Sequence, residues 1–352
     1  MRNFSILLAN LLLAGCAGMS ATPESRVDAL MQRYQGEVPG ASLLVVRNGK
    51  PLIARGYGYA NLEQHTQAGP ETDYRLASIT KQFIAAGILL LREDGALKLD
   101  DPIRKWLPEL PASDDTITLE HMLTHTSGLV DYEDLIPADQ TEQVSDQQVL
   151  DMLSTDHDSY FQPGSAYRYS NTAYVLLGLV IERISGETLP AFLKQRIFDP
   201  LGMNGTLLYE HHRGPAVPHR AYGYSYLDGA WQRTDQSLTS ATRGDGGMYS
   251  SIDDLAKWDA ALYDDRLLSD ESRRLAFRPH VKVTDEPYEA SYGFGWRITG
   301  DTVWHSGESM GFRNVIVRWP QQHFTVILLS NRNDPEPYQT ALAIAQIYQA
   351  SP

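Results

Sequence analysis

The stretch Ser78-Ile79-Thr80-Lys81 places a serine three residues before a lysine, at the start of an apolar segment that continues to Asp94. Gly95 follows, and glycine is the residue that most often ends a helix. The segment therefore predicts a helix over residues 81–94, with Ser78 at its first turn. Residues three apart lie on one face of a helix, so the lysine amine can sit beside the serine hydroxyl. Such a pair supplies a nucleophile together with its own base.

Segments on both sides of this helix predict a sheet built from the two ends of the chain. Residues 26–37 have the apolar spacing of an amphipathic helix. Residues 41–46 and 51–57 have the composition of strands, and Asn48-Gly49 between them is a strong hairpin signal. Strand patterns return near the C-terminus at 293–299, 302–306, 312–319 and 324–329, followed by a helix at 338–348.

Between residue 100 and about residue 285 the sequence alternates helical segments with loops. The predicted helices cover 119–124, 145–154, 172–184, 189–197 and 252–263. This order predicts an α+β fold, in which an antiparallel sheet is flanked by helices from both chain ends and a mostly helical lobe is inserted. We expect one domain over residues 26–350, with a sheet lobe at about 26–100 and 286–350 and a helical lobe at about 101–285.

The N-terminus has the features of a secretory lipoprotein leader. Met1-Arg2-Asn3 carries one positive charge, and the apolar run from Phe4 to Ala14 that follows is too short to span a bilayer. Leu13-Ala14-Gly15-Cys16 matches a bacterial lipobox, and Cys16 is the only cysteine in the chain. We expect residues 1–15 to be a signal peptide and lipidated Cys16 to begin a tether over 16–25. The protein would then be anchored in the bacterial cell envelope, facing the periplasm or the exterior. An ordinary signal peptide with an incidental cysteine is the alternative.

The composition excludes two classes of protein. The formal net charge is −14 at pH 7, so no basic surface is available to neutralise the phosphates of a nucleic acid. Hydrophobic residues make up 42% of the chain, which is too few for a protein with many membrane spans. The expected partners are a small-molecule or peptide substrate and, through the lipid anchor, a membrane.

Two further motifs supply groups that a serine and lysine pair needs for acyl transfer. Tyr169-Ser170-Asn171 follows the turn signal Pro163-Gly164 and offers a phenol and an amide just before a predicted helix. His305-Ser306-Gly307 lies on a predicted strand, where alternation puts His305 and Gly307 on the same face. A glycine at this position lets the backbone of a substrate approach the strand edge closely.

These three motifs, in this order, resemble the class C β-lactamase-like family of serine hydrolases, which also includes low-molecular-mass penicillin-binding proteins, D-alanyl-D-alanine carboxypeptidases, D-aminopeptidases and esterases. The resemblance covers roughly residues 26–350. Flanking segments are similar as well, namely Tyr74-Arg75-Leu76-Ala77, 123–129, 244–251 and Gly311-Phe312-Arg313. The resemblance implies a β-lactamase/transpeptidase-like fold and hydrolysis through an acyl-enzyme, without a cofactor.

The resemblance also implies roles for individual residues. Ser78 attacks a carbonyl carbon, Lys81 helps to remove the serine proton, and Tyr169 shuttles that proton to the leaving group and later activates water. Asn171 orients Lys81 and binds the substrate amide. The oxyanion hole consists of the backbone N–H groups of Ser78 and Glu308.

The third motif bears on the substrate. In many β-lactamases it begins with lysine, whereas several carboxypeptidases, D-aminopeptidases and esterases have a histidine, as at His305. This histidine would be a weak, pH-dependent cation for a substrate carboxylate. Arg313 is a second candidate cation, with a surface strand position as the alternative. We therefore expect a D-alanyl-D-alanine-carboxypeptidase-like peptidase or a carboxylesterase that binds substrate at Asn171, His305, Gly307 and Arg313. A class C-type β-lactamase is the alternative.

Another motif, Gly307-Glu308-Ser309-Met310-Gly311, matches the nucleophile elbow of α/β-hydrolases. That elbow must be followed by a helix, whereas residues 312–319 here have a strand pattern. No Asp or Glu lies between Ser309 and His323, the only later histidine. We therefore reject Ser309 as the nucleophile.

Two alternatives concern a metal and the absence of turnover. His121 and His125 are four residues apart, as zinc ligands on a helix can be, but Met122 occupies the position of a zincin glutamate. We therefore expect no metal, and a packing role for His125 near a helix end. A non-catalytic penicillin-binding sensor is the alternative of another class, although the chain has every polar group that turnover needs.

Overall fold

The computed structural model describes residues 22–156, 158–210, 214–284 and 289–350. The predicted signal peptide, Cys16 and the tether up to residue 21 lie outside the described residues. The end of the expected tether is helical, because α1 covers Pro23–Leu30, with Thr22 as its N-cap. None of the helices among the described residues has the length and apolar character to cross a membrane.

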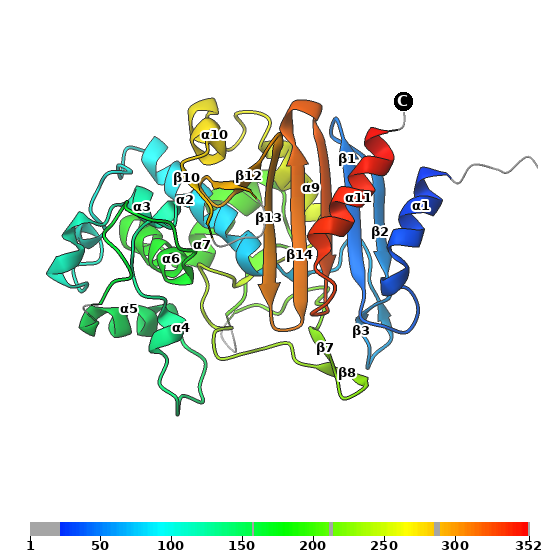
Figure 1. Cartoon of the computed structure of the whole chain (residues 1–352), viewed down its shortest axis with the longest axis horizontal. Coiled ribbons are helices and arrows are strands. Elements are labelled where there is room, and N and C mark those ends of the chain that lie inside the picture. The colour runs from blue at the N-terminus through cyan, green and yellow to red at the C-terminus, as the bar shows by residue number, and fades with distance from the viewer. Residues whose placement is uncertain (1–21, 157, 211–213, 285–288, 351–352) are drawn as a thin grey trace, which may run out of the picture.

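In the described part of the chain, eight antiparallel strands form the central sheet (Figure 1). Its order is β10-β11-β12-β13-β14-β15-β1-β2, so strands from both chain ends lie side by side. The predicted N-terminal hairpin is present as β1 (Ala41–Arg47) and β2 (Lys50–Tyr57). Strand β1 pairs along its whole length with β15 (Phe324–Ser330). The predicted α+β fold is therefore confirmed.

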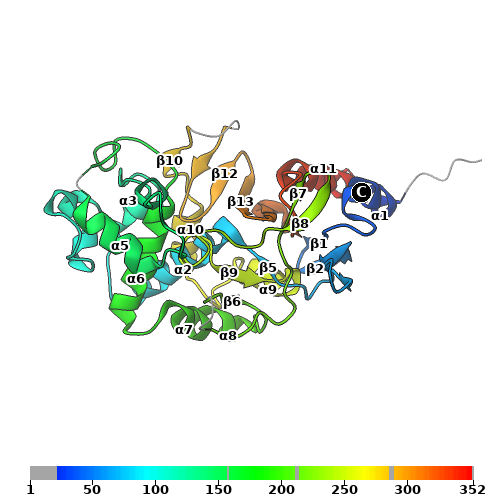
Figure 2. The ribbon, with the colours of Figure 1, turned by 90° about the horizontal axis from the view of Figure 1, so that it is seen from below.

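The other strands of this sheet are β10 (Val281–Lys282), β11 (Ser291–Tyr292), β12 (Arg297–Thr299), β13 (Thr302–Ser309) and β14 (Phe312–Trp319). Figure 2 shows a smaller sheet, which consists of β5 (Tyr74–Arg75), β9 (Met248–Ser250) and β6 (Leu207–Leu208). Two hairpins complete the strands, β3 (Tyr59–Asn61) with β4 (Thr66–Gln67) and β7 (Tyr224–Leu227) with β8 (Ala230–Arg233). Strands this short show no usable alternation, which is why the sequence does not predict them.

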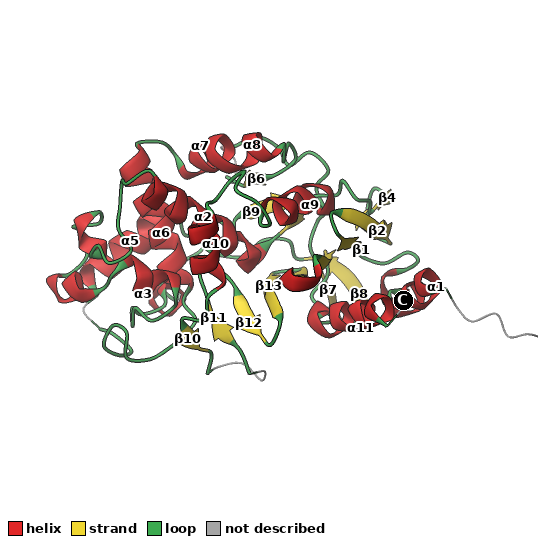
Figure 3. Cartoon of the chain, turned by 90° about the horizontal axis from the view of Figure 1, so that it is seen from above, coloured by secondary structure: helices red, strands yellow, loops and turns green. Residues whose placement is uncertain are grey.

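Helices cover both faces of the central sheet (Figure 3). On one face, α1 and α11 (Pro337–Gln349) bury an apolar cluster with the strands. On the other face, α9 (Ile252–Ala261) packs against β1 and β15. The sequence places α9 in the helical lobe, whereas in the structure α9 lies on the central sheet, and β10 joins this sheet at residue 281. The apolar face of α9 has to be covered, and the sheet covers it.

Helix α2 (Thr80–Glu93) runs through the main core, and every residue from Thr80 to Leu91 is buried. It packs against α6 (Asn171–Ser185). The remaining α-helices are α3 (Leu119–Leu123), α4 (Tyr132–Leu135), α5 (Asp146–Thr155), α7 (Leu189–Leu193), α8 (Asp199–Leu201) and α10 (Asp270–Phe277). A π-helical turn, Lys194–Phe198, joins α7 to α8. The 3₁₀ turns are Gln32–Tyr34, Ala77–Ile79, Ile103–Lys105, Ala112–Thr116 and Pro320–Gln322.

Asp73, which precedes β5, gives the fold a predicted pH dependence. Its carboxyl is fully buried, accepts a hydrogen bond from the backbone N–H of His219 (3.3 Å) and lies near Asp254. Burial raises its pKa from 3.8 to about 7. The folded state therefore holds this proton more tightly than the unfolded chain, so this contribution to stability is complete below pH 4 and is lost as the pH rises to about 7.

Asp73→Asn is therefore expected to stabilise the protein at pH 8 by up to about 4 kcal/mol, since one pKa unit corresponds to about 1.4 kcal/mol. Urea unfolding of parent and variant at pH 5 and pH 8 checks this prediction. The difference in unfolding free energy between variant and parent should be larger at pH 8 than at pH 5. An equal difference at both pH values would refute the assignment to Asp73.

Candidate active site

Ser78 lies in a 3₁₀ turn, η2 (Ala77–Ile79), between strand β5 and helix α2. Ala77 has a φ of 49°, a left-handed conformation that a residue with a side chain rarely adopts. Such a conformation costs of the order of 1–3 kcal/mol and persists where the surrounding structure holds it. Here β13 packs against the turn. The nucleophile therefore sits at a fixed point between the N-terminus of α2 and the central sheet.

Gly307 is needed for this packing. A Cβ atom on Gly307 would lie 2.0 Å from the backbone oxygen of Leu76, the residue that leads into the turn. The space over this glycine is therefore filled by the chain itself. Packing within the chain thus explains the glycine, and the approach of a substrate backbone to the edge of β13 stays a prediction.

Lys81 is fully buried, and its Nζ atom has three hydrogen-bond partners. It lies 3.1 Å from Ser78 Oγ, 2.9 Å from Asn171 Oδ1 and 2.9 Å from the backbone oxygen of Asp245. The last two are carbonyl oxygens, which only accept hydrogen bonds. When the amine is neutral, its two N–H groups can donate to them, which leaves its lone pair directed at the Ser78 hydroxyl. The geometry thus orients Lys81 as an acceptor for the serine proton.

Asn171, the first residue of α6, links Lys81 to two acidic side chains. Its Nδ2 donates to Glu133 Oε1 (3.0 Å), and its backbone N–H donates to Asp131 Oδ2 (3.2 Å). Burial raises the pKa of both carboxyls, and the charge of Asp131 adds to the effect on Glu133. The expected contact between Asn171 and Lys81 is therefore present, whereas no sequence motif indicates Glu133.

The structure also brings Tyr169 to this group. Lys81 Nζ is 4.9 Å from the centroid of the Tyr169 ring, and the guanidinium of Arg297 is 5.3 Å from it. The buried ring of His125 lies 4.3 Å from the same ring, and its Nδ1 accepts a hydrogen bond from the backbone N–H of Ser170 (3.0 Å). His125 thus holds the loop that carries Tyr169, which is the packing role expected for it.

His121 and His125 do not share a helix face, because α3 ends at Leu123. His121 instead accepts a hydrogen bond at Nδ1 from the backbone N–H of Thr118 (3.3 Å). The parts of the chain that the structure describes contain no group of three or more His, Cys, Asp or Glu residues that could hold a metal ion.

His305 does not present the cation that the sequence suggests. Its ring is fully buried, its Nδ1 donates to the backbone oxygen of Ser306 (2.6 Å), and its Nε2 accepts from the hydroxyl of Tyr292 (3.0 Å). Burial and the nearby charge of Arg297 hold its pKa well below the ordinary value, so the ring is neutral at pH 7. Both ring nitrogens already have hydrogen-bond partners within the protein. His305 therefore has no N–H group left to bind a substrate carboxylate.

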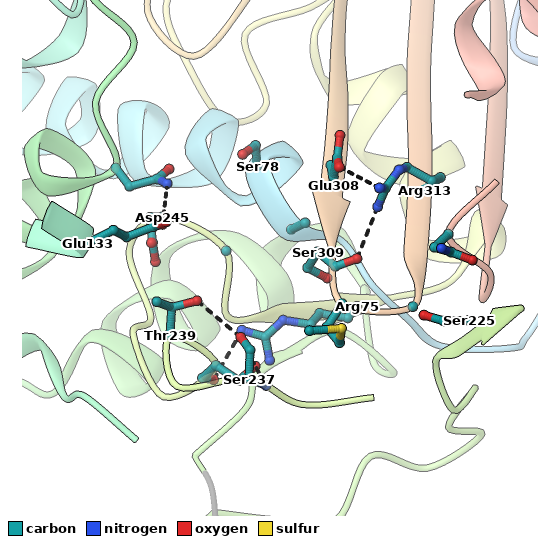
Figure 4. A pocket seen from close by; sticks show the side chains of 17 residues that line it. Arg75, Ser78, Glu133, Ser225, Ser237, Thr239, Asp245, Glu308, Ser309 and Arg313 are labelled. Atoms are coloured by element: carbon teal, nitrogen blue, oxygen red, sulfur yellow. Dashed lines mark hydrogen bonds and ion pairs between the residues drawn. The ribbon is translucent and has the colours of Figure 1, made fainter. Parts of the chain in front are cut away.

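A pocket of about 410 Å³ opens beside Ser78 (Figure 4). Ser78 and Glu308, whose N–H groups are the expected oxyanion hole, both line it. Arg313 lines it too, but it forms an ion pair with Glu308 and donates to the backbone oxygen of Ser309 (3.1 Å). The positive charge of Arg313 is therefore already balanced within the protein. The charged residues around the pocket are Arg75, Glu133, Asp245, Glu308 and Arg313.

Tyr169→Phe is expected to lower kcat/KM for p-nitrophenyl acetate by about 10²-fold or more, the range of general acid–base catalysis. The substitution keeps the ring contacts with Lys81 and His125 and removes only the hydroxyl. Steady-state kinetics measure the effect, and Tyr348→Phe, a buried tyrosine of α11, is the matched control. Equal rates for Tyr169→Phe and its parent would exclude Tyr169 as the proton carrier.

Comparison with known proteins identifies the family of the chain. The family model described as beta-lactamase matches residues 24–350. Penicillin-binding protein 4* of Bacillus subtilis (strain 168) is 35% identical over 319 residues, which cover 86% of this chain and 70% of that protein. The chain covers 70% of the length of that protein and 63% of the length of a second curated relative, Protein flp of Staphylococcus aureus (strain MRSA252).

Two solved structures are similar over most of the chain. The octameric penicillin-binding protein homologue from Pyrococcus abyssi has a TM-score of 0.82 at 28% identity, covering 93% of this chain and 77% of that one. The D-amino acid amidase from Ochrobactrum anthropi SV3, complexed with L-phenylalanine amide, has a TM-score of 0.78 at 27% identity, covering 92% of this chain and 100% of that one. From the family match and these relatives, we conclude that the chain belongs to the β-lactamase family of serine hydrolases, which act through an acyl-enzyme.

Proposed function

We propose that this protein hydrolyses an amide or ester through an acyl-enzyme on Ser78, as a D-alanyl-D-alanine-carboxypeptidase-like peptidase or a carboxylesterase. The observation that carries the proposal is the position of Lys81 Nζ, 3.1 Å from Ser78 Oγ and held by two carbonyl oxygens. A serine hydroxyl next to an amine with this orientation is an activated nucleophile. The similarity to a D-amino acid amidase supports an amide substrate.

In the proposed reaction, Ser78 Oγ forms a bond to the substrate carbonyl carbon while its proton passes to Lys81 Nζ. The negative charge that develops on the carbonyl oxygen is stabilised by the backbone N–H groups of Ser78 and Glu308 and by the N-terminus of α2. The bond to the leaving amine or alcohol then breaks, and the proton reaches that group by way of Tyr169. Water attacks the resulting ester by the reverse route, releases the acid and restores the Ser78 hydroxyl.

The charges around the pocket support a peptidase or esterase more than a β-lactamase. The position that is lysine in many β-lactamases is here a buried, neutral histidine, His305. Arg313 is paired with Glu308. Strand β13 therefore lacks the exposed cation that a β-lactamase would use there to bind its substrate.

Three substrates test the proposal on one preparation: p-nitrophenyl acetate, an acylated D-alanyl-D-alanine peptide and a fluorescent penicillin. Catalytic turnover of the ester or the peptide, abolished by Ser78→Ala, is the expected result. A stable penicillin label on a protein that turns over neither substrate would favour the sensor alternative, and rapid penicillin hydrolysis would favour a β-lactamase.

We further propose that the enzyme is anchored in the cell envelope through Cys16. The support is the lipobox at residues 13–16 and the small-residue segment that follows it. Fractionation of cells that express the full chain checks this. The parent should sediment with membranes and Cys16→Ser should not, and a parent found in the soluble fraction would refute the anchor.

A further inference from the structure

Arg75 is a buried cation whose countercharge the described part of the chain does not supply. It lies on β5, three residues before Ser78, and lines the same pocket. Only 3% of the residue is exposed, and Nη2 donates to the backbone oxygen of Ser240 (3.1 Å). Nε and Nη1 have no hydrogen-bond partner among the described residues, and no carboxylate there forms an ion pair with the guanidinium. A buried positive charge that lacks a carboxylate and hydrogen-bond acceptors is unfavourable unless a ligand supplies them.

The pocket carboxylates are engaged with other groups. Glu308 forms an ion pair with Arg313, and Glu133 accepts a hydrogen bond from Asn171. Asp245 Oδ2 accepts from the hydroxyl of Tyr132 (3.0 Å), while Asp245 Oδ1 has no hydrogen-bond partner among the described residues. The described residues around the pocket therefore leave Arg75 as the arginine whose charge is unbalanced, since Arg313 already has a carboxylate partner.

The surroundings of Arg75 are those of an oxyanion site. Three hydroxyl residues of one segment, Ser237, Thr239 and Ser240, line the pocket next to it, and Ser225 lines it from β7. The hydroxyl of Ser237 lies 3.2 Å from those of both Thr239 and Ser240. In Figure 4, the Arg75 side chain lies beside Ser237 and Thr239. A guanidinium among hydroxyl donors suits a carboxylate, which can accept several hydrogen bonds at once.

The backbone of Arg75 is held by hydrogen bonds, and burial together with the bond from Nη2 to Ser240 restricts its side chain. Arg75 of β5 pairs with Tyr249 of β9, and the backbone oxygen of Arg75 accepts a hydrogen bond from Asn314 Nδ2 (2.8 Å). Binding to a fixed arginine loses less side-chain entropy than binding to a mobile one.

We propose that Arg75 binds a carboxylate of the substrate, so that the enzyme selects peptides or esters that carry a free carboxylate close to the scissile bond. This inference rests on the proposed function and adds the substrate class. It moves carboxylate recognition from His305, where the sequence places it, to Arg75 on β5, the strand that leads into the nucleophile turn.

The test compares two probes, N-acetyl-D-alanine and its neutral amide, whose dissociation constants are measured by ligand-observed NMR titration of the full protein. The parent should bind the carboxylate at least about tenfold more tightly than the amide, as expected for a charged hydrogen-bonded pair. Arg75→Gln should bring this ratio close to one, and Arg75→Lys, which keeps the charge without the fork, should give an intermediate ratio. Arg183→Gln, on the surface of α6, should leave the ratio at the parent value.

A parent ratio near one, or a ratio unchanged in Arg75→Gln, would overturn the proposal. Circular dichroism shows whether each variant folds. If Arg75→Gln does not fold, the decision falls to Arg75→Lys and to salt titration of the parent, in which the ratio should fall as ionic strength rises. Binding needs no turnover, so the outcome is independent of the hydrolysis assays. Failure of the parent to hydrolyse any substrate would refute the proposed function and still leave the ratio measurable.

Discussion

Ser78→Ala is expected to lower kcat/KM for p-nitrophenyl acetate by about 10⁴-fold or more, as removal of a serine nucleophile does in enzymes of this chemistry. The reason is geometric: Ser78 Oγ is the hydroxyl that Lys81 Nζ contacts, at 3.1 Å. The substitution removes one oxygen atom and leaves the turn, the helix and the Lys81 contacts with Asn171 and Asp245 in place. The melting temperature should therefore change little while the activity disappears.

Ser309→Ala is the matched control for this experiment. Ser309 lines the same pocket and is the central residue of the rejected nucleophile elbow. The elbow is followed by strand β14 and not by a helix, so Ser309 has no general base of the expected kind. Ser309→Ala should keep the greater part of its activity. The reverse pattern, with activity lost in Ser309→Ala and kept in Ser78→Ala, would mean that the wrong serine has been assigned.

Lys81→Met is expected to lower the rate of acylation by about 10³-fold or more, because it removes the base but keeps the length and apolar stem of the side chain. Two buried carbonyl oxygens, of Asn171 and Asp245, lose a donor in this variant, so a loss of stability of about 1–3 kcal/mol should accompany the loss of activity. Stopped-flow acylation by a fluorescent penicillin and urea unfolding measure the two effects separately. Lys105→Met, at an exposed position, is the control for lysine removal.

Lys81→Arg separates two roles of the lysine. Arginine keeps a positive charge at the site but does not lose a proton in proteins. If Lys81 acts as the base, this variant should be as slow as Lys81→Met, provided that circular dichroism shows it folded. Acylation at the parent rate in Lys81→Arg would show that the charge alone matters and that the proton goes elsewhere.

Local sequence patterns predict the fold well where they are long. The Asn48-Gly49 hairpin and the strands β13, β14 and β15 carry enough alternating or continuous apolar residues to identify them. The two-residue strands β5 and β6 carry no such pattern, because their pairing with β9 depends on contacts between distant segments. For the same reason the sequence does not reveal that α9 packs on the central sheet.

Sequence motifs likewise predict some features of the site and miss others. The order of the three motifs is enough to predict that Ser78, Lys81, Tyr169 and Asn171 lie together, as they do in the structure. The alternation of β13 correctly places His305 and Gly307 on one face but does not show what covers that face. The backbone oxygen of Leu76 fills the space next to Gly307, and the hydroxyl of Tyr292 donates a hydrogen bond to His305 Nε2.

Other site residues act only through tertiary contacts. Glu133 reaches Asn171 from a short helix that has no motif, and Asp245 contributes a backbone oxygen, which any residue type could supply. Arg75 lies in a segment similar to the family, but only the structure shows that its charge has no carboxylate partner among the described residues. Charge balance in a pocket depends on which groups meet in space, and a linear pattern does not contain that information.

The central claim is that Ser78 carries the acyl group during turnover. The most direct test is to quench the enzyme with acid during hydrolysis of p-nitrophenyl butyrate, measure the mass of the intact protein, and map the modified peptide. One butyryl group per chain, located on Ser78 and absent from Ser78→Ala, is the predicted result. A butyryl group on any other residue, or rapid turnover with no acylated protein at any quench time, would contradict it.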